Sequence, residues 1–398
     1  MAAEFDSVIP MMAMIEGLSD VFRRQPMLRA RLAGQAPRWR FVFDARFEDV
    51  AVSTVDMSST ALEDVFAAEC DNVLDIERGP LWRVLLGMAG PAPTASGVTL
   101  MVVTFAHAIV DGVSGFSFAR QVLEAVNGRT GDREPFSVRP PLENGLSPSA
   151  PLDVVPAPPA GGRWPFAKDV PFAQRRTNML VGRIDQGIAG HVLRRCRAEE
   201  VKVDAFFTAA IQAALARTSP AALSLPVLGA FDARRIMDPP VPPDEIGMFM
   251  KDMCLFDATW PVSDVDVWER ARRVSRVIAQ ERQRELARPT EQFTDEIYQQ
   301  IKMAAAYPLD GFPFSFSVSN MGRQSFIRSG TAGLKSIYLS SADRIGIMGF
   351  QAVLAAVDGD LHVAFVHADP LLSPEEISQV RDGLTELMRA EAQKIARI

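Results

Sequence analysis

The sequence VTLMVVTFAHAIVDG, at residues 98–112, decides which fold we expect for this chain. Its first eight residues are mostly apolar on both faces of a strand, which is typical of a strand buried inside a sheet. A helical pattern follows from about Val113 to Val126. The stretch therefore predicts a buried strand, then a tight loop with a histidine, an aspartate and a glycine, then a helix that packs back on the sheet. Loops at the ends of such strands commonly carry functional residues.

Other patterns place this stretch within a larger organisation. Before it come two helical patterns and a strand pattern, at residues 11–32, 60–69 and 81–88. After it, residues 128–172 are dense in proline and glycine and show little hydrophobic period, which is typical of a linker. A chain of 398 residues is long enough for two domains. We therefore expect an N-terminal half and a C-terminal half, at residues 1–127 and 173–398.

The C-terminal half alternates helical and strand patterns. In chain order we expect helices at 187–199 and 204–217, strands near 225–231 and 248–257, a long helix at 264–288 and a half-buried strand at 312–320. Asp358-Gly359-Asp360 suits the tight turn of a hairpin between residues 347–357 and 361–367. Ser373-Pro374-Glu375-Glu376 combines a capping box with proline at the first helical position, so it should begin a C-terminal helix. Both halves thus mix helix and strand, and we predict an α/β (α+β) fold.

The composition excludes several classes of protein. A formal net charge of -7 argues against a nucleic-acid surface, because phosphate binding needs a concentrated basic face. The three cysteines lie far apart and form no Cys-x-x-Cys pair, which fits a reducing compartment. No stretch reaches the roughly 18 apolar residues of a membrane span, and the N-terminal residues lack the basic region of a signal peptide. We expect a cytoplasmic monomer whose partners are small molecules or proteins.

The chain has four histidines, which can be considered one by one. His191 begins a predicted surface helix and is expected to be solvated. His362 and His367 lie five residues apart on one predicted strand, so their side chains should leave opposite faces and should not share a metal ion. No further ligand cluster accompanies His107 and Asp111. We therefore predict no metal site.

His107 is the candidate catalytic base. A lone histidine near an aspartate is more often a structural hydrogen-bonding group, but here a buried strand delivers the ring into a loop where it would be held in place. Ser114 offers an alternative, because Gly112-Val113-Ser114-Gly115-Phe116 nearly matches the Gly-x-Ser-x-Gly elbow of serine hydrolases. Phe116 replaces the closing glycine, and His107 precedes the serine instead of following it. A serine hydrolase is thus the less favoured interpretation.

The segment Ala106-His107-Ala108-Ile109-Val110-Asp111-Gly112 resembles the His-His-x-x-x-Asp-Gly motif of the condensation-domain and thioester-dependent acyltransferase superfamily. That superfamily includes chloramphenicol acetyltransferase, plant hydroxycinnamoyl transferases, polyketide-associated acyltransferases and peptide-synthetase condensation domains. Ala106 replaces the first histidine, and the plant-type Asp-Phe-Gly-Trp-Gly segment is absent. Five further segments are similar to family segments and follow the same order: FRRQPMLRARL at 22–32, PLWRVLL at 80–86, VDAFFTAAIQAALAR at 203–217, FDARRIMDPPVPPDEIGMF at 231–249 and SFSVSNMG at 315–322.

The resemblance implies a fold and a role for each motif residue. Two chloramphenicol acetyltransferase-like subdomains, each a mixed sheet flanked by helices, would form a V with a central tunnel. His107 would be the general base that faces the tunnel. Asp111 would support the motif by pairing with Arg234, with Arg235 as the competing partner, because a buried carboxylate needs a counter-charge. Gly112 would permit the tight backbone between strand and helix.

Ser317, Ser319 and Asn320 lie on the polar side of the last predicted strand before the hairpin, or at its end. Given the resemblance, they are candidates for stabilising an oxyanion or for orienting the acceptor. They could equally satisfy backbone groups at the end of the strand.

The implied activity is the transfer of an acyl group from a thioester to a hydroxyl or amine acceptor. The donor would be coenzyme A or the phosphopantetheine arm of an acyl carrier protein, with no cofactor bound permanently. We expect a role in natural-product biosynthesis, with polyketides or nonribosomal peptides. The alternative is a non-catalytic or rearranging domain of the same fold that binds a carrier-tethered intermediate, and a hydrolase that uses Ser114 is less favoured still.

Overall fold

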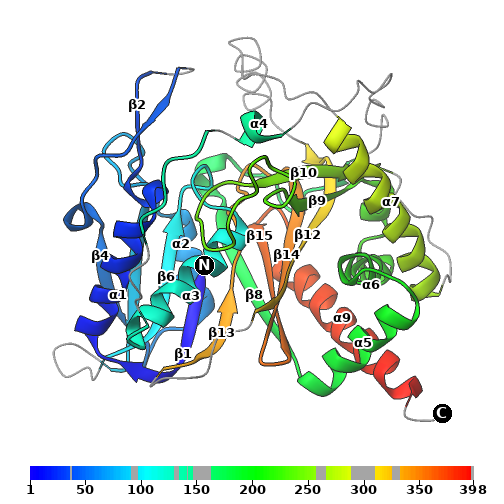
Figure 1. Ribbon diagram of the computed structural model, residues 1–398. Helices are drawn as coiled ribbons and strands as arrows, with labels where there is room; N and C mark the ends of the chain where they lie inside the picture. Colours follow the sequence, from blue (N-terminus) through cyan, green and yellow to red (C-terminus); the bar gives the residue numbers. More distant parts are fainter. Residues whose placement is uncertain are drawn as a thin grey trace.

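The computed structural model describes residues 1–35, 38–90, 97–129, 134–140, 142–146, 163–256, 266–287, 310–324 and 332–395. Much of the predicted linker therefore lies outside the described residues, as do the ends of the strand predicted at 248–257 and of the helix predicted at 264–288. The described residues form two main sheets that stand side by side, with helices packed on them (Figure 1). This is the α/β fold class that the sequence predicts.

In the part of the chain that the structure describes, five strands form the N-terminal sheet, in the order β13-β1-β6-β5-β4. Their bounds are β1 Ala2–Ile9, β4 Val52–Asp56, β5 Trp82–Met88, β6 Val98–Phe105 and β13 Leu334–Tyr338. The strand β6 is the one that the opening stretch predicts, and it pairs antiparallel with β1 and β5. Helices α1 (Met11–Arg24) and α3 (Gly112–Val126) bury their apolar sides on one face of this sheet. Because β6 is the central strand, the loop that follows it leaves a well-anchored part of the sheet.

Helix α2 (Leu62–Asp71) lies on the other face of the N-terminal sheet, toward the second sheet. Its Val65 and Phe66 pack with Leu100 and Val102 of β6 and with Val366 of the second sheet. The two halves thus share an apolar cluster, which fixes their relative position through burial of apolar area.

Strand β13 reaches the N-terminal sheet from the C-terminal part of the chain. It pairs antiparallel with β1, so that Ala2 lies opposite Tyr338 and Glu4 lies opposite Ser336. Sequence patterns did not predict this strand, because its five residues are too few to show a clear period. One strand therefore crosses between the two predicted halves.

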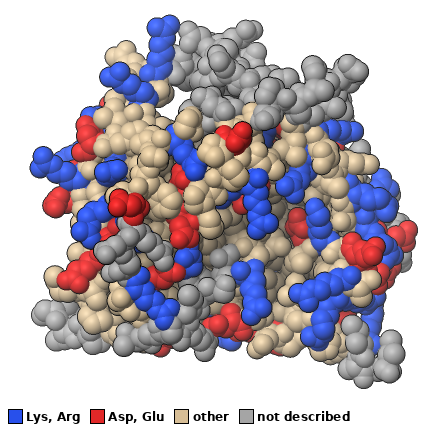
Figure 2. Space-filling view, in the orientation of Figure 1, with Lys and Arg blue, Asp and Glu red and all other residues tan. Residues whose placement is uncertain are grey.

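The second sheet has six strands among the described residues, in the order β10-β9-β12-β14-β15-β8. Their bounds are β8 Arg176–Ile184, β9 Val227–Asp232, β10 Met250–Leu255, β12 Phe314–Gln324, β14 Met348–Val357 and β15 Asp360–Asp369. In the described ranges, one face packs on the helices α5 Gln186–Ala198, α6 Val203–Thr218, α7 Val267–Ala287 and α9 Pro374–Ile395. Lys and Arg side chains gather on the outer surface of this half, over α5 and α7 (Figure 2). The opposite face of the sheet packs against the N-terminal half.

Smaller elements complete the description. They are β2 Arg31–Ala33, β3 Arg40–Val42, α4 Leu142–Gly145, β7 Trp164–Pro165, β11 Gly311–Phe312 and the 3-10 helices η1 Pro26–Arg29, η2 Phe47–Asp49, η3 Phe172–Gln174 and η4 Pro220–Ser224. The helix predicted over residues 11–32 ends at Arg24, because the following Pro26 disfavours helical backbone at Gln25. No helix of the described ranges is long and apolar enough to cross a membrane.

Two local signals are confirmed at the C-terminal end. The turn between β14 and β15 has positive φ at Asp358 (52°) and Gly359 (94°), as a tight hairpin turn requires. At the start of α9, the amide of Glu376 donates to Ser373 Oγ at 3.1 Å, and the amide of Ser373 donates to the Glu376 carboxylate at 3.3 Å. The capping box therefore forms as predicted.

His362 and His367 point to opposite faces of β15. His362 Nδ1 lies 3.4 Å from the hydroxyl of Tyr338, on the side of the N-terminal sheet. His367 sits opposite Phe350 in the register, on the side of the helices, and neither of its ring nitrogens has a hydrogen-bond partner among the described residues. Burial lowers the pKa of His367 to about 4. Both histidines are therefore structural.

Acidification should destabilise the protein through His367. The folded state takes up this proton only near pH 4, whereas an unfolded histidine takes it up at its ordinary pKa of 6.5. The stabilisation is thus complete above pH 6.5 and is lost as the pH falls toward 4, by up to about 3 kcal/mol. Urea unfolding at pH 7 and pH 4.5 checks this: His367→Leu should lose less stability than the wild type, whereas His191→Gln, on an exposed helix, should behave like the wild type. Equal losses in the wild type and His367→Leu would contradict the assignment.

Candidate active site

His107 lies in the turn that follows β6, and its side chain is exposed to solvent. Its Nδ1 lies 3.0 Å from the backbone carbonyl oxygen of Val110. Because a carbonyl oxygen can only accept, this contact assigns the hydrogen of the neutral ring to Nδ1. Nε2 is then left with a lone pair that can take a proton from another molecule. The turn therefore holds a histidine in the tautomer that a general base needs.

Asp111 caps α3 and forms the centre of a buried network. Its Oδ1 accepts hydrogen bonds from the amide of Ser114 at 2.7 Å and from Arg234 Nη2 at 2.9 Å. Its Oδ2 accepts one from the amide of Phe249 at 2.8 Å. Asp111 and Arg234 are 2% and 3% exposed, so the ion pair is screened from water. The network ties the motif loop to the C-terminal half, because Arg234 and Phe249 belong to that half.

Arg234 is the arginine that contacts Asp111, and Arg235 is exposed. The Nη1 of Arg234 donates to Asp232 Oδ1 at 2.9 Å, and its guanidinium carbon lies 4.8 Å from the centre of the Phe249 ring. The guanidinium thus joins two carboxylates and an aromatic face, an arrangement that its planar fork suits. The structure brings together the pair that the resemblance implied.

Ser114 is fully buried and its hydroxyl is already occupied. It donates to the carbonyl of Gly247 at 2.8 Å, and it accepts from the amide of Gly247 at 2.9 Å and from Arg234 Nη2 at 2.6 Å. A hydroxyl has one hydrogen and two lone pairs, so these three bonds satisfy it completely. The geometry gives a nucleophilic Ser114 no access to substrate, and the serine-hydrolase interpretation is therefore wrong.

Gly112 is the first residue of α3 and does not have a positive φ. A Cβ at this position would lie 2.7 Å from the Sδ of Met321 in β12, which is the flexible end of that side chain. The end of β12 therefore lies close to the motif loop.

The two serines and the asparagine of β12 fall on opposite faces of the strand. Phe316 and Val318 pack toward the helices, so Ser317 and Ser319 face the N-terminal half. Asn320 instead lines a cavity of about 110 Å³ on the helix side, together with Asp204 and Thr208 of α6. Its Oδ1 accepts a hydrogen bond from the amide of Gly322 at 3.0 Å. The structure thus separates Asn320 from the two serines, which were expected with it on the polar side of the strand or at its end.

Sequence reasoning missed Asp252 on β10. The side chains of Met253 and Leu255 pack toward the helices, and Lys251 Nζ donates to the backbone oxygen of Glu285 in α7. By alternation along the strand, Asp252 points to the other face of the sheet. Burial raises the pKa of its carboxyl, and the charge of His107 partly opposes that rise. The Asp252 side chain is nevertheless exposed to solvent, as that of His107 is.

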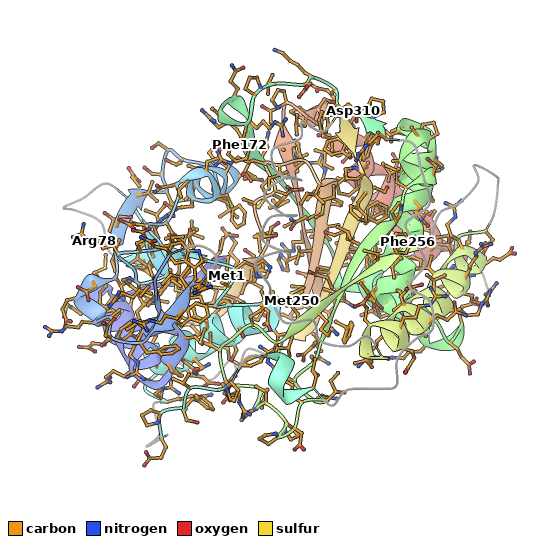
Figure 3. The ribbon with its side chains drawn as sticks, turned by 90° about the horizontal axis from the view of Figure 1, so that it is seen from above. Met1, Arg78, Phe172, Met250, Phe256 and Asp310 are labelled. Carbon is orange, nitrogen blue, oxygen red and sulfur yellow. The ribbon has the colours of Figure 1, made fainter. Side chains whose placement is uncertain are left out.

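The strand β10 runs from the junction of the two halves outward. Viewed from above, Met250 at its start lies near the middle of the molecule, and Phe256 just beyond its end lies toward the outer side of the C-terminal half (Figure 3). The amide of Asp111 donates to the carbonyl of Gly247 at 3.1 Å, so the segment that leads into β10 packs directly on the motif loop. Across the described ranges, no three His, Cys, Asp or Glu side chains gather closely enough to hold a metal ion.

Comparison with known proteins gives a match in structure and none in sequence. No protein-family model and no curated protein matches the chain. The condensation domain of the Monacolin K polyketide synthase MokA is similar, with a TM-score of 0.64 and 13% identity over 98% of this chain and 91% of that one. The epimerization domain of the third module of tyrocidine synthetase B gives a TM-score of 0.63 and 13% identity over 99% and 91%. The X-domain of teicoplanin biosynthesis, solved as a complex with OxyB, gives 0.56 and 16% over 99% and 88%.

These likenesses establish the fold. The chain has the condensation-domain fold, which the resemblance of its motif implied, and its fold neighbours include domains of peptide and polyketide synthases. At identities of 13–16%, the likeness does not define an activity. That has to come from the chemistry of the residues around His107.

Proposed function

We propose that this protein is an acyltransferase that moves an acyl group from a thioester to a hydroxyl or amine acceptor, with His107 as the general base. The observation that carries the proposal is the contact between His107 Nδ1 and the Val110 carbonyl, which in the neutral ring places the hydrogen on Nδ1 and the lone pair on Nε2 of an exposed side chain. The fold neighbours from a peptide synthetase and a polyketide synthase support a role in natural-product biosynthesis.

The chemistry requires little beyond a base and an oxyanion donor, because a thioester is already activated. Nε2 of His107 takes the proton of the acceptor while its oxygen or nitrogen attacks the thioester carbon. The tetrahedral intermediate then collapses, the carbon–sulfur bond breaks, and the imidazolium returns the proton to the departing thiolate. A positioned base contributes about 10²- to 10⁴-fold to such a reaction. No bond to the enzyme forms at any step.

Ser319 is the best placed of the predicted residues to stabilise the oxyanion. Ser319 lies on the face of β12 that meets the N-terminal half. Met321, whose side chain lies next to Gly112, follows two residues later on the same strand. Two residues span about 7 Å of strand. A hydroxyl at that distance from the motif loop could donate to an oxygen of a substrate held at His107.

Ser319→Ala should therefore lower kcat by about 10²-fold and change KM little, because the lost hydrogen bond forms only in the transition state. Steady-state kinetics with a thioester donor measures both constants. Asn320→Ala is the matched control, since its side chain lies on the helix side of the same strand. A loss in Asn320→Ala as large as that in Ser319→Ala would contradict the assignment.

The donor in this proposal is coenzyme A or the phosphopantetheine arm of a carrier protein. Neither is a resident cofactor, because both leave as the free thiol after transfer. Incubation of the purified protein with acyl-coenzyme A, with N-acetylcysteamine thioesters and with a panel of alcohols and amines, followed by mass spectrometry, tests the proposal. An ester or amide that the wild type forms and His107→Ala does not would support it, and absence of any acylated product across the panel would contradict it.

A second candidate is a domain that recruits a partner without transferring a group. Its support is the X-domain of teicoplanin biosynthesis, which shares the fold and has been solved as a complex with OxyB. Replacement of the first motif histidine by Ala106 is compatible with this function as well. Product formation from any thioester donor would discriminate against it, because a recruiting domain leaves the thioester intact.

A further inference from the structure

The hairpin of β2 and β3 has no role in the function proposed above. Its strands form a sheet of their own, and the hairpin extends away from the body of the N-terminal half (Figure 1). Leu32 and Phe43 pack against the apolar core of that half. Arg31 donates two hydrogen bonds of 2.7 Å to the carboxylate of Asp44. The base of the β2–β3 hairpin is therefore fixed, while its outer part reaches into solvent.

The β2–β3 hairpin is strongly basic. Residues 29–46 contain five arginines and one aspartate, a net charge of +4 in a chain whose net charge is -7. Lys and Arg side chains are visible on the projecting part (Figure 2). Arg38 and Arg40 are exposed, and among the described residues no carboxylate pairs with either. Two guanidinium groups in this state fit a partner that supplies carboxylates or phosphates.

Aromatic side chains accompany these arginines. Phe41 is 37% exposed, and by alternation along β3 it lies on the face opposite Arg40. Trp39 is half-buried between the two arginines in the sequence. Arginine and aromatic side chains are enriched where proteins bind other proteins. A long nucleic acid would also meet the acidic remainder of the chain, so an acidic protein is the partner that this surface favours.

Backbone hydrogen bonds connect the base of the β2–β3 hairpin to the motif loop. The carbonyl of Ala30 accepts from the amide of Leu81 at 3.1 Å, and the carbonyl of Leu81 accepts from the amide of Ala106 at 2.8 Å. Ala106 directly precedes His107. Neighbouring backbones joined in this way lie about 4.8 Å apart, so the base of the hairpin lies about 10 Å from Ala106. A protein bound to the hairpin is therefore close to the loop that carries His107.

We propose that the β2–β3 hairpin docks an acidic carrier protein that presents the acyl donor. Coenzyme A needs no protein-sized surface, whereas a carrier protein is a folded domain from which the thioester arm extends. Carboxylates of the carrier pair with Arg38 and Arg40, and its apolar side chains cover Phe41. The inference rests on the proposed function for the identity of the partner, but docking itself is a binding property.

Binding of a holo acyl carrier protein of fatty-acid synthesis, a small acidic domain, tests the docking. Biolayer interferometry at low ionic strength should show that Arg38→Glu/Arg40→Glu raises Kd by at least about tenfold, because both attractive contacts become repulsive. Arg38→Lys/Arg40→Lys should keep most of the affinity. Arg194→Glu/Arg197→Glu, which reverses two exposed charges on the outer helix α5, is the matched control and should change Kd less than about twofold.

Transfer kinetics give a second measurement. The ratio of kcat/KM for the acylated carrier to kcat/KM for the N-acetylcysteamine thioester of the same acyl group should fall by about tenfold in Arg38→Glu/Arg40→Glu. The small thioester has no carrier to dock, so the ratio separates lost docking from damage to the fold, which would lower both constants together.

The docking assignment would be overturned if the wild type failed to bind the carrier protein, or if Arg38→Glu/Arg40→Glu bound it equally well. Tighter binding of duplex DNA or of phosphatidylserine vesicles than of the carrier protein would also overturn it. Carrier binding that depends on Arg38 and Arg40, without transfer from any thioester, would leave the docking standing and contradict the acyltransferase function. Transfer from the small thioester without carrier binding would do the reverse.

Discussion

Replacing His107 with alanine should lower turnover with a thioester donor by about 10²- to 10⁴-fold and leave the fold unchanged. The loss follows from removing the group that takes the acceptor proton, and the range is that of a positioned general base. The fold should survive because the ring is exposed and its hydrogen bond is to a backbone carbonyl within the same turn. Surface substitutions of this kind usually change stability by less than about 0.5 kcal/mol. Initial rates and thermal unfolding, measured on the same preparation, check both parts.

His191 provides a matched control for this experiment. It lies on α5, far from the motif, and its Nδ1 also contacts a backbone carbonyl, that of Gly187 at 2.8 Å. His191→Ala should keep at least about a third of wild-type turnover, because the substitution removes a similar ring with a similar contact. The assignment of His107 would not survive if the two variants lost turnover equally, or if His107→Ala kept near-wild-type rates with the same product.

The second large effect concerns stability. Asp111→Ala should lower the free energy of unfolding by about 3–5 kcal/mol, because it removes the buried carboxylate that pairs with Arg234 and leaves the guanidinium only the more exposed Asp232. The amides of Ser114 and Phe249 lose their acceptor at the same time. Urea unfolding at neutral pH measures the loss. Activity should fall with it, since the network holds the loop that carries His107.

The adjacent arginines allow a direct comparison. Arg234→Ala should destabilise the protein by about as much as Asp111→Ala, whereas Arg235→Ala should change the free energy of unfolding by less than about 0.5 kcal/mol. The double variant Asp111→Ala/Arg234→Ala should lose less than the sum of the single losses, because each single change already removes the contact between the two side chains. Additive losses would show that the two side chains do not act as a pair.

Local patterns in the sequence were enough to predict the elements that carry the motif. Strand β6 has the predicted bounds, and α3 and the hairpin turn at Asp358 form where composition and turn chemistry place them. Strands β1, β4, β8 and β13 were missed. Their burial depends on partners far away in the chain, so their sequences show no strict alternation or continuous apolar run.

The site could be predicted where one motif defines it and not where two distant segments meet. His107 and Asp111 lie four residues apart in the sequence, so their spacing carries the information. Asp252 and Asn320 depend on the face that each strand presents, and a shift of one residue reverses that face. The alternation of Met253 and Leu255 around a charged residue is the one signal that could have drawn attention to Asp252.

The pairing of β1 with β13 also has a consequence for biosynthesis. Residue 338, the partner of residue 2 in the sheet, is made 336 residues later. An N-terminal sheet that forms before then has β1 as an open edge, the kind of surface that invites pairing with other chains. Contacts this far apart in sequence also slow folding. We expect the nascent chain to need protection at this edge until β13 emerges from the ribosome and closes it.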